Sequence, residues 1–121
     1  MLLDSNILIY SVDPKFAALR EFLVTNRFAI SAISRLEVLG YHRWSESQRI
    51  EMETMLNEFQ TFPIAEDIIE RAITLRQIRK MGLADSIIAA TALVHSETLV
   101  TRNLADFHLV AGLKLINPLA P

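Results

Sequence analysis

The sequence predicts an α/β fold in which helices flank a central parallel sheet. Short apolar runs alternate along the chain with longer segments whose apolar residues recur at helical spacing, and this alternation is typical of a parallel sheet. The apolar runs are short, as expected for strands that are buried on both faces. At 121 residues the chain is long enough to bury a core, and we expect residues 1–121 to form a single domain.

The strands and helices are predicted to alternate over most of the chain. The predicted strands are Met1–Asp4, Phe28–Ser31, Thr61–Ile64, Thr98–Thr101 and Lys114–Ile116. The predicted helices are a short one after Asp4, then Pro14–Val24, 33–43, one that begins at Ser45, Glu66–Arg79 and Leu83–His95.

Local signals set several of these boundaries. Pro14 fits the first turn of a helix. Ser45 and Gln48 have the spacing of a capping box, in which each side chain bonds the other's backbone N–H. Gly82 ends one helical pattern before the next begins. Leu83–His95 is apolar on nearly every side, so we expect this helix to be central and buried, with its alanines packed closely on the sheet.

Composition excludes several classes of protein. Hydrophobic residues make up 51% and charged residues 21%, which is ordinary globular composition. The chain has no cysteine, which excludes disulfides and thiolate metal sites and suits a cytoplasmic protein. No apolar run is long enough to span a membrane, and the first residues lack the basic start of a signal peptide. The net charge of −2 decides nothing about nucleic-acid binding.

Four acidic residues are candidates for an active site, although each has an ordinary structural explanation. Asp4 follows a strand and would also serve as a helix N-cap. Glu37 would equally suit the edge of an amphipathic helix. Asp85 lies in the first turn of an apolar helix, where an acid favours the helix dipole. Asp106 follows a strand closely and would pass for a loop residue.

The common placement of these acids is the evidence for a site. The carboxyl ends of the strands of an open α/β sheet meet at one edge, where ligands bind, and all four acids can reach that edge. Four ionised carboxylates would repel one another strongly there without a counter-ion. We therefore expect a metal ion, and in its absence at least one acid whose pKa is raised by like-charge repulsion. An oxygen-only ligand set favours Mg²⁺ or Mn²⁺ over zinc.

Four segments together resemble the PIN domain, a family of ribonucleases. They are Leu2–Asn6, Leu36–Gly40, Leu83–Ala92 and Leu99–Phe107, and the last two are the most specific. The resemblance runs from Met1 to about Pro118, and the length matches the VapC toxins of bacterial toxin–antitoxin pairs. It implies a PIN-like sheet in the order 3-2-1-4-5, Mg²⁺- or Mn²⁺-dependent endoribonuclease activity, an RNA substrate, a cognate antitoxin and a homodimer.

The resemblance also assigns roles to residues. Asp4, Glu37, Asp85 and Asp106 match the family's acidic positions, with Asp4 and Asp85 as the firmest metal ligands. Glu37 and Asp106 then act through water or at a second metal site. Four polar residues are expected to position these acids: Ser5, Asn6, Thr101 and Asn103. Arg102 lies between two of them and is expected to contact an RNA phosphate.

Two other functions remain as alternatives. An aspartyl phosphotransferase would use Asp4 as a nucleophile, but it usually has a second acid where this chain has Asn6, and a lysine after a later strand is lacking. A catalytically silent binding module with the same fold is the other alternative. The basic residues Arg71, Arg76, Arg79 and Lys80 are predicted to form a solvated helix face.

Overall fold

The computed structural model describes residues 1–119 and contains a five-stranded parallel sheet in the order β3-β2-β1-β4-β5. The strands are β1 (Leu2–Leu3), β2 (Ala29–Ser31), β3 (Gln60–Phe62), β4 (Leu99–Val100) and β5 (Leu115–Ile116). All five predicted strands are present, each within about a residue or two of its predicted bounds. The parallel sheet and the strand order that the resemblance implied are therefore confirmed.

Seven α-helices and one 3₁₀ helix connect these strands in the described part of the chain. They are α1 (Ser5–Tyr10), η1 (Pro14–Phe16), α2 (Ala17–Thr25), α3 (Ala32–Leu39), α4 (Glu46–Asn57), α5 (Glu66–Ile78), α6 (Leu83–Val94) and α7 (Leu104–Phe107). The predicted capping box of α4 is present, with Gln48 N donating to Ser45 Oγ at 3.2 Å and Ser45 N donating to Gln48 Oε1 at 3.0 Å.

Two predicted helix bounds were wrong. Pro14 opens a 3₁₀ turn rather than the α-helix, which begins only at Ala17. The helix predicted over 33–43 ends at Leu39, because the carbonyl of Val38 accepts a hydrogen bond from the indole Nε1 of Trp44 at 2.6 Å. That side chain folds the segment after α3 back onto its last turn. Sequence spacing alone does not reveal this contact.

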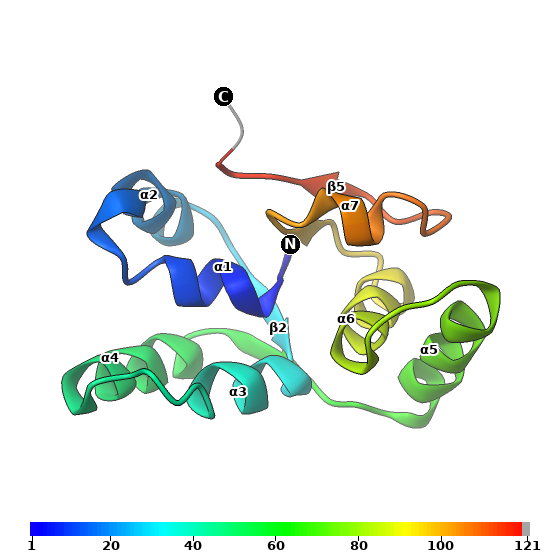
Figure 1. Cartoon of the computed structure of the whole chain (residues 1–121), viewed down its shortest axis with the longest axis horizontal. Coiled ribbons are helices and arrows are strands. Elements are labelled where there is room, and N and C mark those ends of the chain that lie inside the picture. The colour runs from blue at the N-terminus through cyan, green and yellow to red at the C-terminus, as the bar shows by residue number, and fades with distance from the viewer. Residues whose placement is uncertain (120–121) are drawn as a thin grey trace.

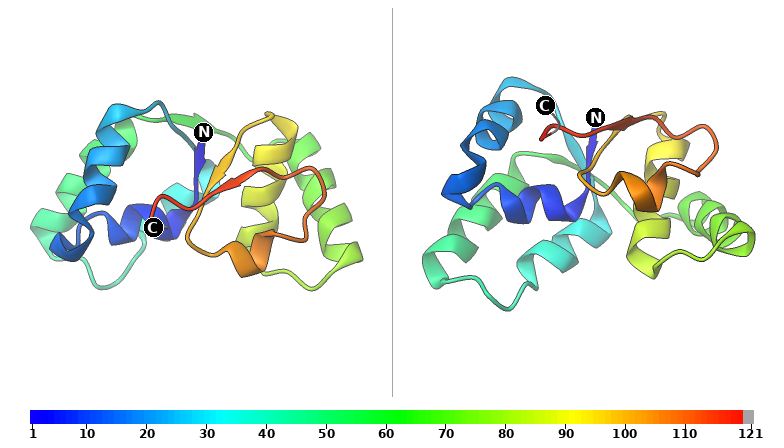
Figure 2. Two further views of the ribbon diagram at one scale, coloured as in Figure 1. Left: turned by 90° about the horizontal axis from the view of Figure 1, so that it is seen from above. Right: turned by 45° about the horizontal axis from the view of Figure 1, so that its top comes forward.

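Two helical layers cover the sheet (Figure 1), and the strands alternate their side chains between them. Leu2 and Leu99 face the layer of α5, α6 and α7, whereas Leu3, Ile30 and Val100 face the layer of α1 to α4. Figure 2 shows the two layers on opposite sides of the sheet from two further directions. The short, wholly apolar strands are thus explained by burial on both faces.

Helix α6 lies in the core, as its sequence predicts. Ile88, Ala89 and Ala90 are fully buried, and small side chains let the helix backbone approach the sheet closely. Helix α5 packs on the side of α6 that faces away from the sheet, through Ile68 and Leu75. None of the helices in residues 1–119 is long and apolar enough to cross a membrane.

Three helices begin where strands end, and this arrangement positions the site. Helix α1 follows β1 after Asp4, α3 follows β2 directly at Ser31, and α7 follows β4 after a turn. The backbone N–H of Asp4 donates to the carbonyl of Val100 at 2.9 Å, so the ends of the two central strands lie in register. Side chains from these three connections therefore gather at one edge of the sheet.

Candidate active site

Asp4 is held at the end of β1 by a residue from the end of β4. Its side chain is only 4% exposed, and its Oδ2 accepts a hydrogen bond from Thr101 Oγ1 at 2.8 Å. The backbone N–H of Asn103 donates to that same hydroxyl oxygen at 2.9 Å. Because the threonine oxygen already accepts from a backbone donor, its own proton is directed to the carboxylate.

Glu37 reaches the same edge from α3 through a pair of buried serines. Ser5 Oγ donates to Glu37 Oε1 at 2.7 Å and lies 2.9 Å from Ser34 Oγ. Ser5 Oγ is the donor in both contacts, so its single proton is shared between the Glu37 carboxylate and the Ser34 hydroxyl. Ser34 was not among the predicted site residues. Its spacing of three residues before Glu37, which places both on one helix face, is the signal that could have identified it.

Asp106 and Asp85 approach from the other helical layer. Asp106 lies in the short helix α7 and not in a loop, which was its ordinary structural explanation. Its carboxylate accepts a hydrogen bond from the Asn103 side chain. Asp85 lies in the first turn of α6 and is partly buried. Asn103 therefore bonds Asp106 with its side chain and orients Thr101 with its backbone.

The four carboxylates interact electrostatically. Burial raises the pKa of Asp4 from 3.8 to about 6; the hydrogen bond from Thr101 lowers it, and the charges of Asp85 and Glu37 raise it. Burial also raises the pKa of Asp85, with further upward contributions from the charges of Asp106 and Glu37. Asp85 thus interacts electrostatically with all three other acids. A raised pKa was expected, but desolvation is the leading cause and like-charge repulsion comes second.

The donor set of these acids fits a hard divalent cation. All four offer carboxylate oxygens, and within residues 1–119 none of them forms an ion pair with lysine or arginine. Three accept hydrogen bonds from neutral donors, which leaves their negative charge uncompensated. No three of the described Asp, Glu and His side chains are already close enough together to hold a metal. A bound cation would thus have to draw the acids together, and its positive charge would offset the repulsion between them.

Comparison with known proteins identifies the family. The PIN domain model matches residues 1–113, which is most of the chain and includes all four acids. The chain belongs to the PIN domain family. Ribonuclease VapC10 of Mycobacterium tuberculosis is 36% identical over 123 residues, an alignment that covers 94% of this chain and 90% of that relative.

Solved structures of toxin–antitoxin and VapBC complexes agree with the fold. A toxin–antitoxin complex from Klebsiella pneumoniae contains a chain that is 34% identical, with a TM-score of 0.82, covering 97% of this chain and 96% of that one. A DNA-bound VapBC complex from Salmonella typhimurium has a TM-score of 0.84 at 22% identity, over 97% and 96% of the two chains, and supports the fold alone.

Two basic residues of this PIN domain lie closer to the acids than expected. Arg79 and Lys80 follow α5 and line a cavity of about 340 Å³ together with Gly82, Asp85 and Asp106. Nη1 of Arg79 is buried and, among residues 1–119, has no hydrogen-bond partner. Arg79 is half-buried and so departs from the solvated face predicted for the basic run, whereas Arg71, Arg76 and Lys80 are exposed. The turn between α5 and α6 brings Arg79 and Lys80 to the acids.

Asn6 and Arg102, also predicted site residues, lie in a separate hollow that adjoins the acids through Asn103. Asn6 and Arg102 line a hollow of about 180 Å³ with Tyr10 and Asn103. The guanidinium carbon of Arg102 lies 5.2 Å from the centroid of the Tyr10 ring and 5.4 Å from that of Phe16. The structure thus brings Asn6 beside the acids but shows no hydrogen bond from its side chain within residues 1–119.

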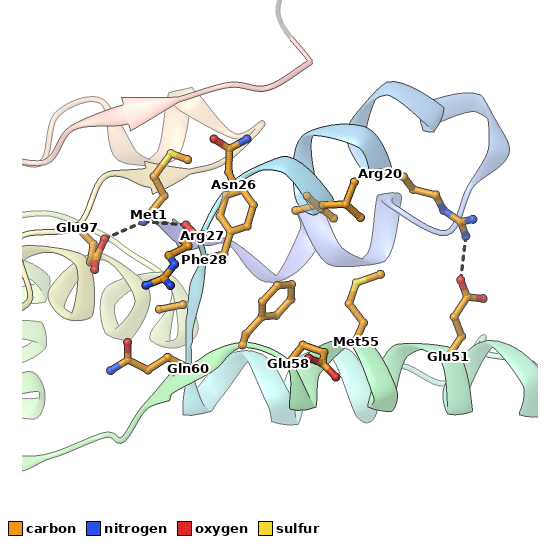
Figure 3. A pocket seen from close by; sticks show the side chains of 14 residues that line it. Met1, Arg20, Asn26, Arg27, Phe28, Glu51, Met55, Glu58, Gln60 and Glu97 are labelled. Carbon is orange, nitrogen blue, oxygen red and sulfur yellow. Dashed lines mark hydrogen bonds and ion pairs between the residues drawn. The ribbon is translucent and has the colours of Figure 1, made fainter.

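A larger cavity of the PIN domain contains none of the four acids. It has a volume of about 810 Å³ and lies between α2, α4 and the start of the sheet (Figure 3). Its charged groups are largely paired: the Met1 amino group lies 2.8 Å from Glu97 Oε2, and Arg20 Nη2 lies 3.1 Å from Glu51 Oε1. The size of this cavity is therefore no argument against the four uncompensated carboxylates as the candidate site.

Proposed function

We propose that this protein is a Mg²⁺- or Mn²⁺-dependent endoribonuclease of the VapC kind, with its active site at Asp4, Glu37, Asp85 and Asp106. The observation that carries the proposal is the buried Asp4 carboxylate, surrounded by acids and without a basic partner among the described residues. The identity of 36% to a protein named as a ribonuclease supports RNA as the substrate.

The proposed roles of the acids follow from how firmly the fold holds them. Asp4 and Asp85 are the principal metal ligands, because Asp4 is fixed by Thr101 and Asp85 lies at electrostatic range of all three other acids. Glu37 and Asp106 complete the site directly or through water. When bound, the divalent cation supplies positive charge and Lewis acidity for hydrolysis of an RNA phosphodiester bond.

Neutral side chains set the directions of these acids. Thr101 directs its proton to Asp4, Ser5 directs its proton to Glu37, and the Asn103 amide donates to Asp106. Each donor stabilises a carboxylate without cancelling its charge, which keeps the oxygens available to a cation. These contacts support the positioning role of Ser5, Thr101 and Asn103, while Asn6 lines the neighbouring hollow with Arg102.

Basic residues near the acids are suited to the RNA backbone. Arg79 and Lys80 line one hollow with Asp85 and Asp106, and Arg102 lines another with Asn103. A guanidinium with unused donors matches the oxygens of a phosphate, and such contacts supply much of the affinity for RNA. We therefore assign Arg102 as a phosphate contact and add Arg79 to it.

A cognate antitoxin is the proposed protein partner. The related chain from Klebsiella pneumoniae was solved in a toxin–antitoxin complex, at 34% identity and over nearly the full length. Because this chain shares that fold and length, we propose that a cognate antitoxin binds and inhibits it.

A second copy of the chain is the other proposed partner, and α5 offers a surface for it. Ile69 and Ile73 are 45% and 44% exposed and lie on one stripe of α5 with Glu66 and Arg76. We call these four residues the α5 stripe. Three of them, Ile69, Ile73 and Arg76, border an apolar groove of about 460 Å³ that continues to Leu83 on α6.

The α5 stripe is complementary to itself. When two copies of α5 pair antiparallel about residue 71, Ile69 faces the partner's Ile73 and Glu66 faces the partner's Arg76. An isologous dimer requires this kind of self-complementary patch. Exposed isoleucines with matching charges at both ends therefore support a homodimer through α5.

A cleavage assay tests the proposed activity. Purified protein is incubated with RNA in Mg²⁺, in Mn²⁺ and in EDTA, with Asp4→Asn as the inactive variant and Glu53→Gln, on the outer face of α4, as the matched control. We expect cleavage in either metal by the wild-type protein and by Glu53→Gln, and none by Asp4→Asn or in EDTA. A wild-type protein that binds RNA without cutting it would favour the silent binding module.

A further inference from the structure

The hollow beside the acid cluster is lined by several kinds of side chain that can bind a nucleotide. Asn6, Tyr10, Arg102 and Asn103 line it, so it combines an aromatic ring, a guanidinium and two amides. It borders the acid site directly, because Asn103 is also the residue that bonds Asp106 and orients Thr101. A molecule that fills this hollow therefore lies next to whatever the acids act on.

Arg102 is fixed in this hollow by aromatic rings instead of an acid. Its guanidinium packs against both Tyr10 and Phe16, whose ring centroids are 5.4 Å apart. In residues 1–119 it forms no ion pair or hydrogen bond, so all its donors remain available. Contact with the rings restricts the side chain without using those donors. A second cation, Lys15 Nζ, lies 5.3 Å from the Phe16 centroid.

The backbone of Arg102 is also held on both sides. Thr101 donates to Asp4 on one side, and Asn103 donates to Asp106 on the other. The position of the guanidinium relative to the acids is therefore set by the same short segment that orients two of them. This geometry suits contact with a nucleotide that adjoins the phosphate being cut.

We propose that the hollow of Asn6, Tyr10 and Arg102 binds one unpaired nucleotide of the RNA, next to the scissile phosphate. This proposal rests on the proposed nuclease function. Arg102 contacts the phosphate, the Tyr10 ring stacks on the base and the Asn6 amide bonds its edge. Bases stack on aromatic rings only when they are free of a duplex, so the site selects single-stranded RNA.

Phosphate contact and base stacking respond differently to salt, which separates the two roles. Binding of a labelled oligouridine is measured in Ca²⁺, which is used here to hold RNA without cleavage, over a range of salt concentrations. Arg102→Ala is expected to reduce the slope of log affinity against log salt by about 0.7, as for one phosphate contact on a single strand. Tyr10→Leu is expected to weaken binding about 5- to 150-fold with the slope unchanged.

Conservative variants guard against loss of folding. Tyr10→Phe keeps the ring and should bind like the wild-type protein, and Arg49→Ala, on the exposed face of α4, serves as the matched control for removal of an arginine. In cleavage assays, Tyr10→Leu should raise KM with kcat nearly unchanged. The melting temperature of each variant shows whether it is folded.

The outcomes separate this proposal from the proposed function. If the wild-type protein cuts RNA but folded Tyr10→Leu and Arg102→Ala match it in affinity, slope and KM, the nucleotide site is wrong and the nuclease stands. Equal affinity for oligouridine and for a duplex of the same length also overturns the site. If the protein binds single strands through these residues but never cuts them, the nuclease is wrong and the site stands. Loss of antitoxin binding with unchanged RNA affinity would assign the hollow to the antitoxin instead.

Discussion

Thr101 Oγ1 donates to Asp4 Oδ2 at 2.8 Å and so joins the ends of the two central strands, 97 residues apart in sequence. Both groups are buried, and a backbone N–H fixes the direction of the hydroxyl. The acid most deeply buried in the site is therefore held by a neutral donor from the neighbouring strand. This contact lowers the pKa of Asp4 against the upward effect of burial.

Removing that hydroxyl should destabilise the protein and impair the site. Thr101→Val has nearly the same shape but leaves a buried carboxylate without its donor, which we expect to cost about 1–3 kcal/mol of unfolding free energy. Thr101→Ser keeps the donor and should lose much less. Urea unfolding of the three proteins at pH 7.5 measures the difference. Equal loss in both variants would mean that the methyl group, and not the hydrogen bond, matters.

The raised pKa of Asp4 predicts how stability depends on pH in the metal-free protein. The folded state holds this proton up to about pH 6, whereas the unfolded chain releases it near 3.8. Between these values the folded state binds more protons, so stability should fall as pH rises from 4 to above 6. The total loss of unfolding free energy over this range is about 3 kcal/mol, because each unit of pKa difference contributes about 1.36 kcal/mol.

Denaturant unfolding in EDTA at pH 4.5, 6 and 7.5 tests this slope. Asp4→Asn should flatten most of it, because the amide does not titrate and still accepts from Thr101. Asp85 contributes in the same direction, so some slope should remain. A wild-type protein whose stability rises over this range would show that Asp4 is not desolvated as described.

The serine pair predicts a positioning effect on Glu37. Ser34→Ala removes the hydroxyl that contacts Ser5 and should reduce RNA cleavage roughly tenfold, since the Ser5 hydroxyl would be less firmly held beside Glu37. Ser34→Thr keeps a hydroxyl and should recover part of the activity. Steady-state cleavage rates, with melting temperatures to compare folding, provide the measurement. Full activity of Ser34→Ala would remove Ser34 from the site.

The α5 stripe predicts a charge-swap experiment on the homodimer. Arg76→Glu alone should weaken dimerisation roughly tenfold by placing like charges opposite each other, and Glu66→Arg with Arg76→Glu should restore it. Ile73→Asp should give monomers. Glu21→Arg, on the exposed face of α2, is the control for a charge reversal outside the α5 stripe. Sedimentation over a range of concentrations measures each equilibrium, and dimers unaffected by all α5 variants would place the interface elsewhere.

Local chemistry explains what the sequence predicted well. The capping box of α4 needs only residues three apart, and the strands show themselves by apolar runs that both helical layers bury. The approach of Arg79 to Asp85 depends instead on the turn around Gly82, and the end of α3 depends on the Trp44 contact. Desolvation of Asp4 depends on the whole packed layer. Such effects arise from tertiary packing, which spacing does not encode.

Direct binding of Mn²⁺ tests the central claim that the four acids form a metal site. Calorimetric titration of the purified protein should show saturable binding that is lost in Asp85→Asn and retained in Asp67→Asn, whose exposed carboxylate lies at the start of α5. This result is expected because Asp85 is the acid that interacts with all three others. Absence of saturable binding by the wild-type protein, or equal binding by the two variants, would contradict the account.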